Sequence, residues 1–225
     1  MRRVIPLCVF MFCLTACLPV KFSITTFPIE GQPTHTATPE PAFTATPSFT
    51  PSPTGGIALD FVAQLCDAKW SNGAQALTAC PISTADQSGG LAAPLDPIPE
   101  GLPAGTPVLL TILGWNGSSA LFLRYPPITV QANDHFRATL RCKRASACDV
   151  QFGLEYFDSA GDYHNAFMVW NYKSGDASIS ADADLTRLAG QPVEFVLVLR
   201  VSHTVTDPGQ DNGLWIAPQI FRPEP

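Results

Sequence analysis

The chain has 225 residues, of which 46% are hydrophobic and only 14% charged, so it is long enough to bury a globular core. Its 13 basic and 19 acidic residues give a net charge of −6. An acidic chain without a basic cluster is repelled by a phosphate backbone and by anionic lipid headgroups. The composition therefore argues against nucleic-acid partners and against electrostatic attachment to a membrane.

The first residues have the pattern of an export signal. Two arginines precede the apolar run Val4–Ala16, which is too short for a membrane-spanning helix. The run ends in Leu14-Thr15-Ala16-Cys17, which resembles the lipobox of bacterial lipoproteins. This resemblance implies that residues 1–16 are a signal peptide, removed before a lipidated Cys17. An ordinary secretory peptide with an incidental cysteine is the alternative.

Export and lipidation define the expected location of the protein. We expect it to be anchored to the cell envelope through its lipid, because several acyl chains hold a protein firmly at a bilayer. The globular part would then face the outside of the cytoplasm. Cleavage removes two arginines and leaves 11 basic against 19 acidic residues, a net charge of −8.

A segment rich in threonine and proline follows the anchor. Residues 31–54 include seven threonines and six prolines among 24 positions. Such a segment cannot bury enough apolar surface to offset its ordering entropy, and proline favours an extended polyproline conformation. We therefore predict a disordered stalk over residues 17–56 and a single folded domain over residues 57–225.

Four cysteines lie in the predicted domain: Cys66, Cys80, Cys142 and Cys148. An even number of cysteines in an exported domain predicts disulfides. Three connectivities are possible, and we favour the local pairs Cys66–Cys80 and Cys142–Cys148, each of which closes a short segment rich in turn residues. Neither spacing is that of a zinc site, and no histidine lies close by.

Alternation of apolar and polar residues with a period of two predicts strands through this domain. The segments Phe136–Cys142, Val150–Tyr156 and Ile179–Leu185 alternate in this way, whereas Val193–Val201 is almost continuously apolar, as in a central strand. Further strands are expected at Val108–Leu113, Ala120–Tyr125, Ala166–Tyr172 and Leu214–Phe221. Eight short strands separated by turn residues predict an all-β fold, an antiparallel β-sandwich.

One segment of the domain has spacing compatible with a helix. In Asp60–Trp70, Phe61, Leu65 and Ala68 recur at helical intervals, so a short helix is possible there.

Four segments in the second half of the chain resemble a known group of modules. ITVQANDHFRATLRC, CDVQFGLEYF, DADLTRLAGQPVEFVLVL and GQDNGLWIAPQI are similar to NPCBM-type and galactose-binding-like jelly rolls. The resemblance implies a jelly-roll-like sandwich and carbohydrate binding. It does not extend to residues 57–105, which could complete the sandwich or decorate it.

One short stretch combines the residue types that bind sugars. Aromatic faces stack on the C–H surfaces of a sugar ring, and amides or hydroxyls bind its hydroxyl groups. This mixture occurs at Tyr163, His164, Asn165, Trp170, Asn171 and Tyr172, the candidate ligand-binding residues. Trp170 and Tyr172 share one face of a strand, and the alternative is that both belong to the core. Trp215, between two apolar residues, is expected in the core.

Other chemistries have weaker support. Asp207 and Asp211 flank a turn where calcium could bind, but they lack the spacing of a calcium loop. Catalytic and cofactor-binding motifs are absent, so we expect neither an enzyme nor a cofactor. Glu155 and Glu194 resemble a glycosidase pair only in residue type, since each occupies an outward strand position where solvated carboxylates are ordinary.

The sequence therefore predicts a lipid-anchored, non-catalytic binding module whose ligand is a glycan. An envelope protein that contacts other proteins without binding sugar is the main alternative, and a hydrolytic enzyme is the third.

Overall fold

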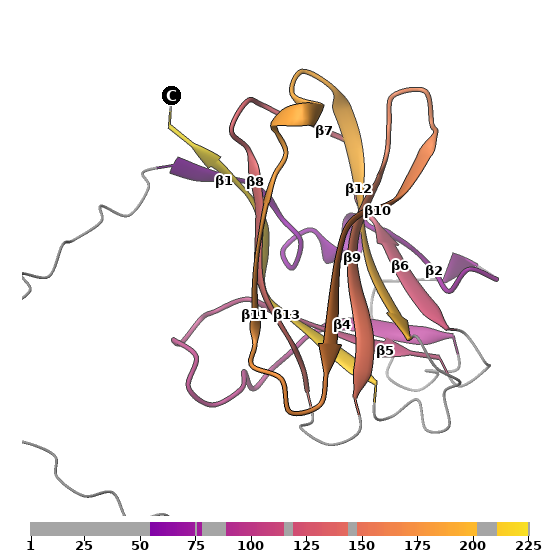
Figure 1. The fold of residues 1–225 in the computed structure, drawn as a ribbon, viewed down its shortest axis with the longest axis vertical. Helices are drawn as coiled ribbons and strands as arrows, with labels where there is room; N and C mark the ends of the chain where they lie inside the picture. Colours follow the sequence, from indigo (N-terminus) through magenta and orange to yellow (C-terminus); the bar gives the residue numbers. More distant parts are fainter. Residues whose placement is uncertain are drawn as a thin grey trace, which may run out of the picture. The chain divides into compact units, whose positions relative to one another are not determined.

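The computed structural model describes residues 55–74, 76–77, 89–114, 119–143, 148–201 and 211–224. These residues form an antiparallel β-sandwich, which confirms the predicted fold class (Figure 1). The signal peptide, Cys17 and the stalk up to residue 54 lie outside the described residues, as do Cys80 and Asp207. No helix within the described ranges is long and apolar enough to cross a bilayer.

The first sheet, sheet A, has six strands in the described residues. Its order is β11-β8-β13-β5-β4, with β1 also paired to β13. The strands are β1 (Gly55–Asp60), β4 (Gly90–Pro94), β5 (Val108–Leu113), β8 (His135–Cys142), β11 (Ile179–Asp184) and β13 (Asn212–Pro223). Every pairing is antiparallel.

The second sheet, sheet B, packs against the first and contains seven strands where the chain is described. Its order is β10-β9-β12-β6-β2-β3, with β7 paired to β12. The strands are β2 (Lys69–Ser71), β3 (Ala76–Leu77), β6 (Ala120–Arg124), β7 (Ile128–Thr129), β9 (Asp149–Phe157), β10 (Tyr163–Lys173) and β12 (Pro192–Val201). From β8 to β13 the chain changes sheet repeatedly, as in a jelly roll.

All eight predicted strands are present, as β5, β6 and β8 to β13. The region 57–105 completes the sandwich, because β1 pairs with β13, β2 with β6 and β4 with β5. These additional strands are short, and their alternation is too brief to be recognised. β1 begins at Gly55, inside the range 17–56 expected for the stalk.

The possible helix at Asp60–Trp70 is not formed. The segment makes a turn, a single 3₁₀ turn η1 (Leu65–Asp67) and then β2. Tertiary contacts bind the backbone of this segment instead: the Phe61 N–H donates to Pro218 O, and Phe61 O, which would accept from Leu65 N–H in a helix, accepts from the Tyr125 hydroxyl at 2.8 Å. Burial of Tyr125 raises the pKa of its hydroxyl, which therefore stays a donor.

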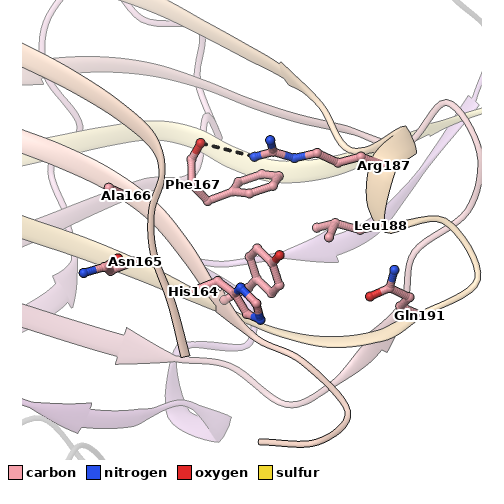
Figure 2. A pocket seen from close by; sticks show the side chains of 8 residues that line it. His164, Asn165, Ala166, Phe167, Arg187, Leu188 and Gln191 are labelled. Carbon is pink, nitrogen blue, oxygen red and sulfur yellow. Dashed lines mark hydrogen bonds between the residues drawn. The ribbon is translucent and has the colours of Figure 1, made fainter. Parts of the chain in front are cut away.

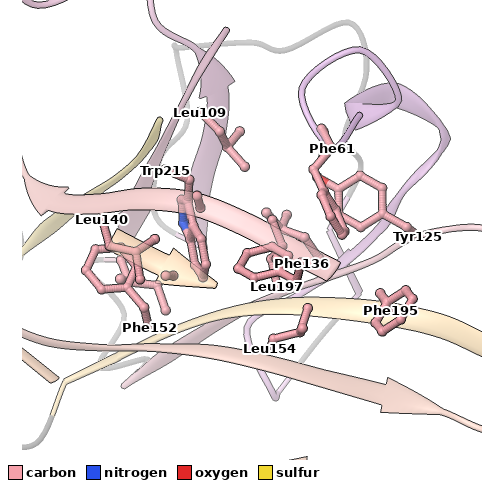
Figure 3. Packing of buried hydrophobic residues seen from close by; sticks show 14 of the residues in the cluster. Phe61, Leu109, Tyr125, Phe136, Leu140, Phe152, Leu154, Phe195, Leu197 and Trp215 are labelled. Atoms are coloured by element: carbon pink, nitrogen blue, oxygen red, sulfur yellow. Dashed lines mark hydrogen bonds between the residues drawn. The ribbon is translucent and has the colours of Figure 1, made fainter. Parts of the chain in front are cut away.

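The space between the sheets is filled by large side chains (Figure 3). Trp215 is fully buried, as expected, and its ring meets Phe152 edge-on with the centroids 4.8 Å apart. Its indole N–H donates to the Thr111 hydroxyl at 3.2 Å, so the only polar atom of the ring is satisfied.

A second, smaller apolar cluster lies on the outer side of sheet A. Val108, Leu110, Leu214 and Ile216 are buried there, with Leu95, Ile98 and Leu102 packed against them. The segment between β4 and β5 thus covers these four residues. Because β5 is buried on both faces, all its residues except Thr111 are apolar and its sequence does not alternate.

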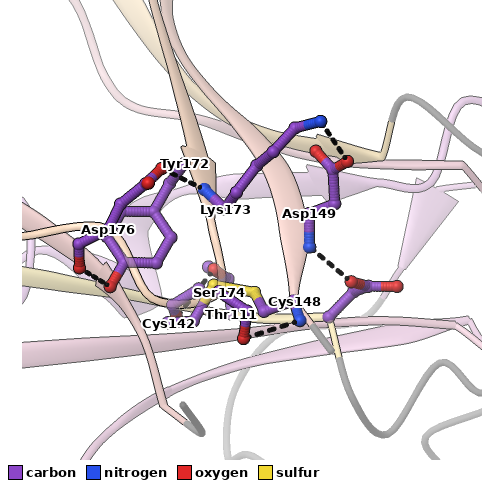
Figure 4. The surroundings of a disulfide bond; sticks show 10 residues. Thr111, Cys142, Cys148, Asp149, Tyr172, Lys173, Ser174 and Asp176 are labelled. Carbon is purple, nitrogen blue, oxygen red and sulfur yellow. Dashed lines mark hydrogen bonds and ion pairs between the residues drawn. A yellow bond between two sulfur atoms is a disulfide. The ribbon is translucent and has the colours of Figure 1, made fainter. Parts of the chain in front are cut away.

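A disulfide joins the end of β8 to the start of β9. Cys142 and Cys148 are bonded, with their Cα atoms 6.4 Å apart, which confirms this predicted pair (Figure 4). Cys66 is also disulfide-bonded, while its predicted partner lies outside the described residues. Ser174, directly after β10, also bonds to this region, because its N–H donates to Cys148 O at 2.7 Å.

Candidate functional site

All six candidate ligand-binding residues lie on β10, but their side chains point in different directions. Tyr172 points into the core with 8% of its surface exposed, and its hydroxyl donates to Asp176 O. Trp170 packs against Phe136, with ring centroids 5.7 Å apart. These two residues therefore do not form an exposed platform, and the core interpretation is the one that their packing supports.

Two other candidates face the outside of sheet B. Asn171 lies opposite Gln151 and accepts a hydrogen bond from its amide at 3.1 Å. Tyr163 lies opposite Phe157, and the two rings stack with their centroids 4.8 Å apart. The Tyr163 hydroxyl donates to Glu155, so this hydroxyl and the amide oxygen of Asn171 are already used within the protein.

The remaining candidates, His164 and Asn165, lie at a wide irregularity in β10. His164 pairs with Tyr156 and Met168 pairs with Leu154, so three residues of β10 oppose the single residue Glu155. Ala166, in the middle of this bulge, has a φ of 53°. The Ala166 N–H donates to the Glu155 carboxylate at 3.2 Å, which holds the bulge to its neighbouring strand.

The bulge forms one wall of a pocket at the end of the sandwich. Its opposite wall is the turn η2 (Thr186–Leu188), which connects β11 to β12. The pocket has a volume of about 400 Å³, within the range of small-molecule sites. The residues that line it are Tyr156, His164, Asn165, Ala166, Phe167, Arg187, Leu188 and Gln191 (Figure 2).

Aromatic rings form the floor of this pocket. The His164 ring stacks on Tyr156 with the centroids 4.4 Å apart and the planes 10° from parallel. Phe167 meets the same tyrosine edge-on at 5.1 Å. Three rings held against one another in this way present a firm apolar surface to a ligand.

Arg187 is fixed at the edge of the pocket. Its guanidinium carbon lies 3.7 Å above the centre of the Phe167 ring, and its Nη2 donates to Phe167 O at 3.4 Å. A cation over an aromatic face is attracted by the ring, so the guanidinium is held in position before any ligand arrives.

Several polar groups in the pocket remain available. The amides of Asn165 and Gln191 and the hydroxyl of Tyr156 make no side-chain hydrogen bond to any other described residue. Figure 2 shows Leu188 and Gln191 opposite His164 across the pocket. The site therefore combines stacked rings with free donors and acceptors, which is the combination that a hydroxyl-rich ligand requires.

His164 is oriented by a carboxylate outside the pocket. Its Nε2 lies 2.8 Å from Asp158 Oδ2, and this hydrogen bond is the main reason why the pKa of Asp158 is lowered. Backbone N–H groups of the same turn, at Asp162 and Ala160, lower it further. Asp158 thus fixes the His164 ring through Nε2 while one face of that ring stacks on Tyr156.

A cluster on the outer side of sheet B supports the bulge from behind. Glu155 is fully buried and accepts two hydrogen bonds from Arg200, at 2.6 and 3.0 Å. The Tyr163 hydroxyl and the Ala166 N–H complete its partners. We name Glu155, Arg200 and Tyr163 the outer cluster. The expectation of a solvated carboxylate is wrong for Glu155, because neighbouring side chains cover it.

A second buried carboxylate supports the opposite wall. Asp134 is fully buried and accepts from Arg222 at 2.9 and 2.8 Å, which is also why the pKa of that arginine is raised. The Asp134 carbonyl accepts from Leu185 N–H, directly before η2. A residue whose buried carboxylate is paired with an arginine therefore contacts each wall: Glu155 contacts the bulge, and Asp134 contacts the residue before η2.

Sequence reasoning found two of the eight lining residues, His164 and Asn165. Tyr156 alternates with the core residues of β9, and Arg187 and Gln191 lie in a connection without a pattern of their own. Only the fold brings the β9–β10 hairpin and η2 to the same end of the sandwich (Figure 1). No motif in the sequence indicates that these segments meet.

The calcium hypothesis gains no support from the described part of the chain. That part contains no group of three or more histidine, cysteine, aspartate or glutamate side chains placed to hold a metal ion. Asp211 is buried, and its carboxylate accepts from the Asp149 N–H at 3.1 Å. Its proposed companion, Asp207, lies outside the described residues.

Comparison with solved structures finds partial similarities to several proteins. An exo-β-agarase is 11% identical, with a TM-score of 0.44 over 75% of this chain and 25% of that one. The xylanase 10B of Clostridium thermocellum, with its CBM22-1 and GH10 modules, is 11% identical with a TM-score of 0.40, over 73% and 28%. The glycoside hydrolase domain of Endo-D from Streptococcus pneumoniae R6 is 13% identical with a TM-score of 0.37, over 59% and 21%.

The chain thus spans between about a fifth and just over a quarter of each of these three proteins. No protein-family model matches the chain, and no curated protein matches it. The comparisons therefore assign it to no family, and the case for a function depends on the pocket.

Proposed function

We propose that the protein is an exported, lipid-anchored, non-catalytic module that binds carbohydrate in the pocket between the β9–β10 hairpin and η2. The observation that carries this proposal is the pairing of a fixed aromatic floor with polar side chains that have no hydrogen-bond partner among the residues that the structure describes. Tyr156, His164 and Phe167 supply the rings, and Asn165 and Gln191 supply the free amides.

The physical match is with a ligand that has both apolar and polar faces. A sugar ring presents C–H groups on its faces and hydroxyls around its rim. Stacking on the floor removes the C–H surface from water, while the amides replace the water bound to the hydroxyls. Because the rings are already packed against one another, little conformational entropy is lost when the ligand binds.

Export is supported by independent features. The lipobox-like sequence around Cys17 supports lipid attachment, and the disulfide Cys142–Cys148 is of a kind that persists in oxidising compartments. The acidic net charge leaves the lipid as the means of holding the protein at the membrane.

The proposal of a non-catalytic role has support in the pairing of the two glutamates. Arg200 holds Glu155, and Arg124 holds Glu194. Neither carboxylate lines the pocket. A general acid or nucleophile must reach the reacting bond, and these two are engaged on the outer side of sheet B instead.

A glycan array tests the proposal. We expect the full chain, purified in mild detergent, to bind a defined group of saccharides, and the double variant Asn165→Ala/Gln191→Ala to lose that binding. The matched control is Gln151→Ala/Asn171→Ala, which removes two amides that bond to each other on the outer side of sheet B. Equal retention by both double variants would contradict the assignment of the site, and the absence of any bound saccharide would contradict carbohydrate binding.

A further inference from the structure

The charge of the pocket differs from that of the rest of the chain. The protein has 19 acidic and 13 basic residues, yet none of the described residues that line the pocket is acidic. Arg187 contributes a permanent positive charge, and Asp158, which bonds to His164 Nε2 at 2.8 Å, does not line the pocket. The residues that line the pocket therefore carry a net positive charge, although the protein as a whole is acidic.

Arg187 also differs from most arginines of the described sandwich. Arg124, Arg137, Arg200 and Arg222 each form an ion pair with a carboxylate, whereas Arg187 forms none with a described residue. Arg141, the sixth, is likewise without an ion pair there but does not line the pocket. Among the described arginines, Arg187 is thus the one that lines this pocket without an ion pair to a described carboxylate.

The contacts of Arg187 leave most of its donors free while fixing its plane. The ring of Phe167 holds one face of the guanidinium, and Phe167 O takes one N–H. A guanidinium carries five N–H groups, and its fork matches the two oxygens of a carboxylate. A guanidinium fixed in this way loses little entropy when it binds an anion.

We propose that the pocket selects carboxylate-bearing sugars, that is, uronic acids, with Arg187 binding the carboxylate and the amides of Asn165 and Gln191 binding hydroxyls. This inference rests on the proposed carbohydrate function and adds the class of sugar. Arg187 is the residue that sets specificity, because a neutral sugar would leave its charge unpaired.

Titration calorimetry on the full chain in mild detergent tests the inference. The probes are short oligomers of galacturonate, glucuronate and mannuronate, each compared with its own methyl ester, which keeps the ring and removes the charge. We expect at least one acid to bind on the order of tenfold or more tightly than its ester, because a hydrogen bond to a charged group is stronger than one to a neutral group.

Variants identify the residue responsible. Arg187→Gln should reduce the affinity for the acid about tenfold and leave the affinity for the ester within about twofold. Arg187→Lys should recover only part of the loss, since it restores the charge without the fork. Arg137→Gln is the matched control: Arg137 also lies over a phenyl ring, that of Phe221, but on the outer side of sheet A, and its loss should not change binding.

The outcomes separate the two proposals. Equal binding of acid and ester, unchanged by Arg187→Gln, would overturn the selection of uronic acids while leaving carbohydrate binding intact. Binding of a sulfated neutral oligosaccharide as tightly as the acid would show that the site senses charge alone, and would overturn selection by a carboxylate. Failure of every acid and every ester, together with an empty glycan array, would overturn the carbohydrate function itself.

Discussion

The outer cluster and the pocket contain similar kinds of residue, but they differ in how many of their polar side-chain groups are hydrogen-bonded within the protein. Both contain an arginine and aromatic rings, and they lie on the two sides of the same bulge in β10. In the outer cluster, Glu155 accepts four hydrogen bonds from three residues of the protein. In the pocket, Arg187 and the amides of Asn165 and Gln191 are without side-chain partners among the described residues other than the Phe167 ring.

This difference indicates which region is scaffold and which is site. A buried carboxylate with all its partners in place stabilises the fold and has no capacity left for a ligand. A fixed arginine with free donors has capacity to bind but contributes little to stability. Aromatic and charged residues therefore indicate function only where their polar atoms remain unused.

The largest effect on stability is expected from removing the charge of Glu155, which tests whether the outer cluster is scaffold. Glu155→Gln should lower the free energy of unfolding by about 3 kcal/mol, because Arg200 is left without a counter-charge in a largely buried site. Glu194→Gln breaks the more exposed pair with Arg124 and should cost about 1 kcal/mol or less. Urea denaturation measures both, and equal losses would show that Glu155 is not a scaffold residue.

Removal of the disulfide should cost stability without affecting binding. Cys142→Ser/Cys148→Ser should lower the free energy of unfolding by about 2 kcal/mol, since the bond closes a short loop. Strand β9 runs from this end, at Asp149, to the pocket end at Phe157, a distance on the order of 25 Å at about 3.3 Å per residue. Affinity for the array ligand should therefore stay within about twofold, and a large loss of affinity would contradict the separation of the two ends.

The pocket amides should behave in the opposite way. Asn165→Ala/Gln191→Ala should change the free energy of unfolding by less than about 0.5 kcal/mol, because both side chains are exposed and bond to no described residue. The melting curve of this variant, recorded beside that of Glu155→Gln, checks the expectation. If the double variant were as unstable as Glu155→Gln, the pocket would have to be considered part of the scaffold.

The smallest expected effect concerns Asp158. His164→Ala removes the hydrogen bond that chiefly lowers the pKa of Asp158, so this pKa should rise toward its ordinary value. The stabilisation associated with a lowered carboxyl pKa is present above the ordinary value and is lost as the pH falls through the lowered one. The variant should therefore lose less stability on acidification than the wild type. NMR titration of the carboxyl group measures the shift, and an unchanged pKa would contradict this contact.

The strands were predictable because each has one face against the core. In β8, buried and partly exposed residues alternate without a break from His135 to Cys142. Trp215 was predictable for a different reason, since apolar neighbours on both sides indicate a strand that is buried on both faces. The sandwich follows from such strands together with the turns between them.

The pocket was not predictable, because it depends on a bulge and on a meeting of distant segments. Ala166 adopts a positive φ that is usually occupied by glycine, so its residue type does not indicate the bulge. Tyr156 and Arg187 are 31 positions apart in the chain, and only the return of β12 beside β9 brings them to one cavity. Tyr172 shows the reverse limitation: its residue type suits a sugar site, but its strand position places it in the core.

The central claim is that the ligand occupies the pocket and not the outer cluster. Amide NMR shifts, followed while the strongest ligand from the glycan array is titrated into the protein, test it most directly. We expect saturable shifts at Asn165, Ala166, Leu188 and Gln191, with those of Gln151 and Val198 on the outer side of sheet B unchanged. Saturable shifts confined to the outer side of sheet B would contradict the claim.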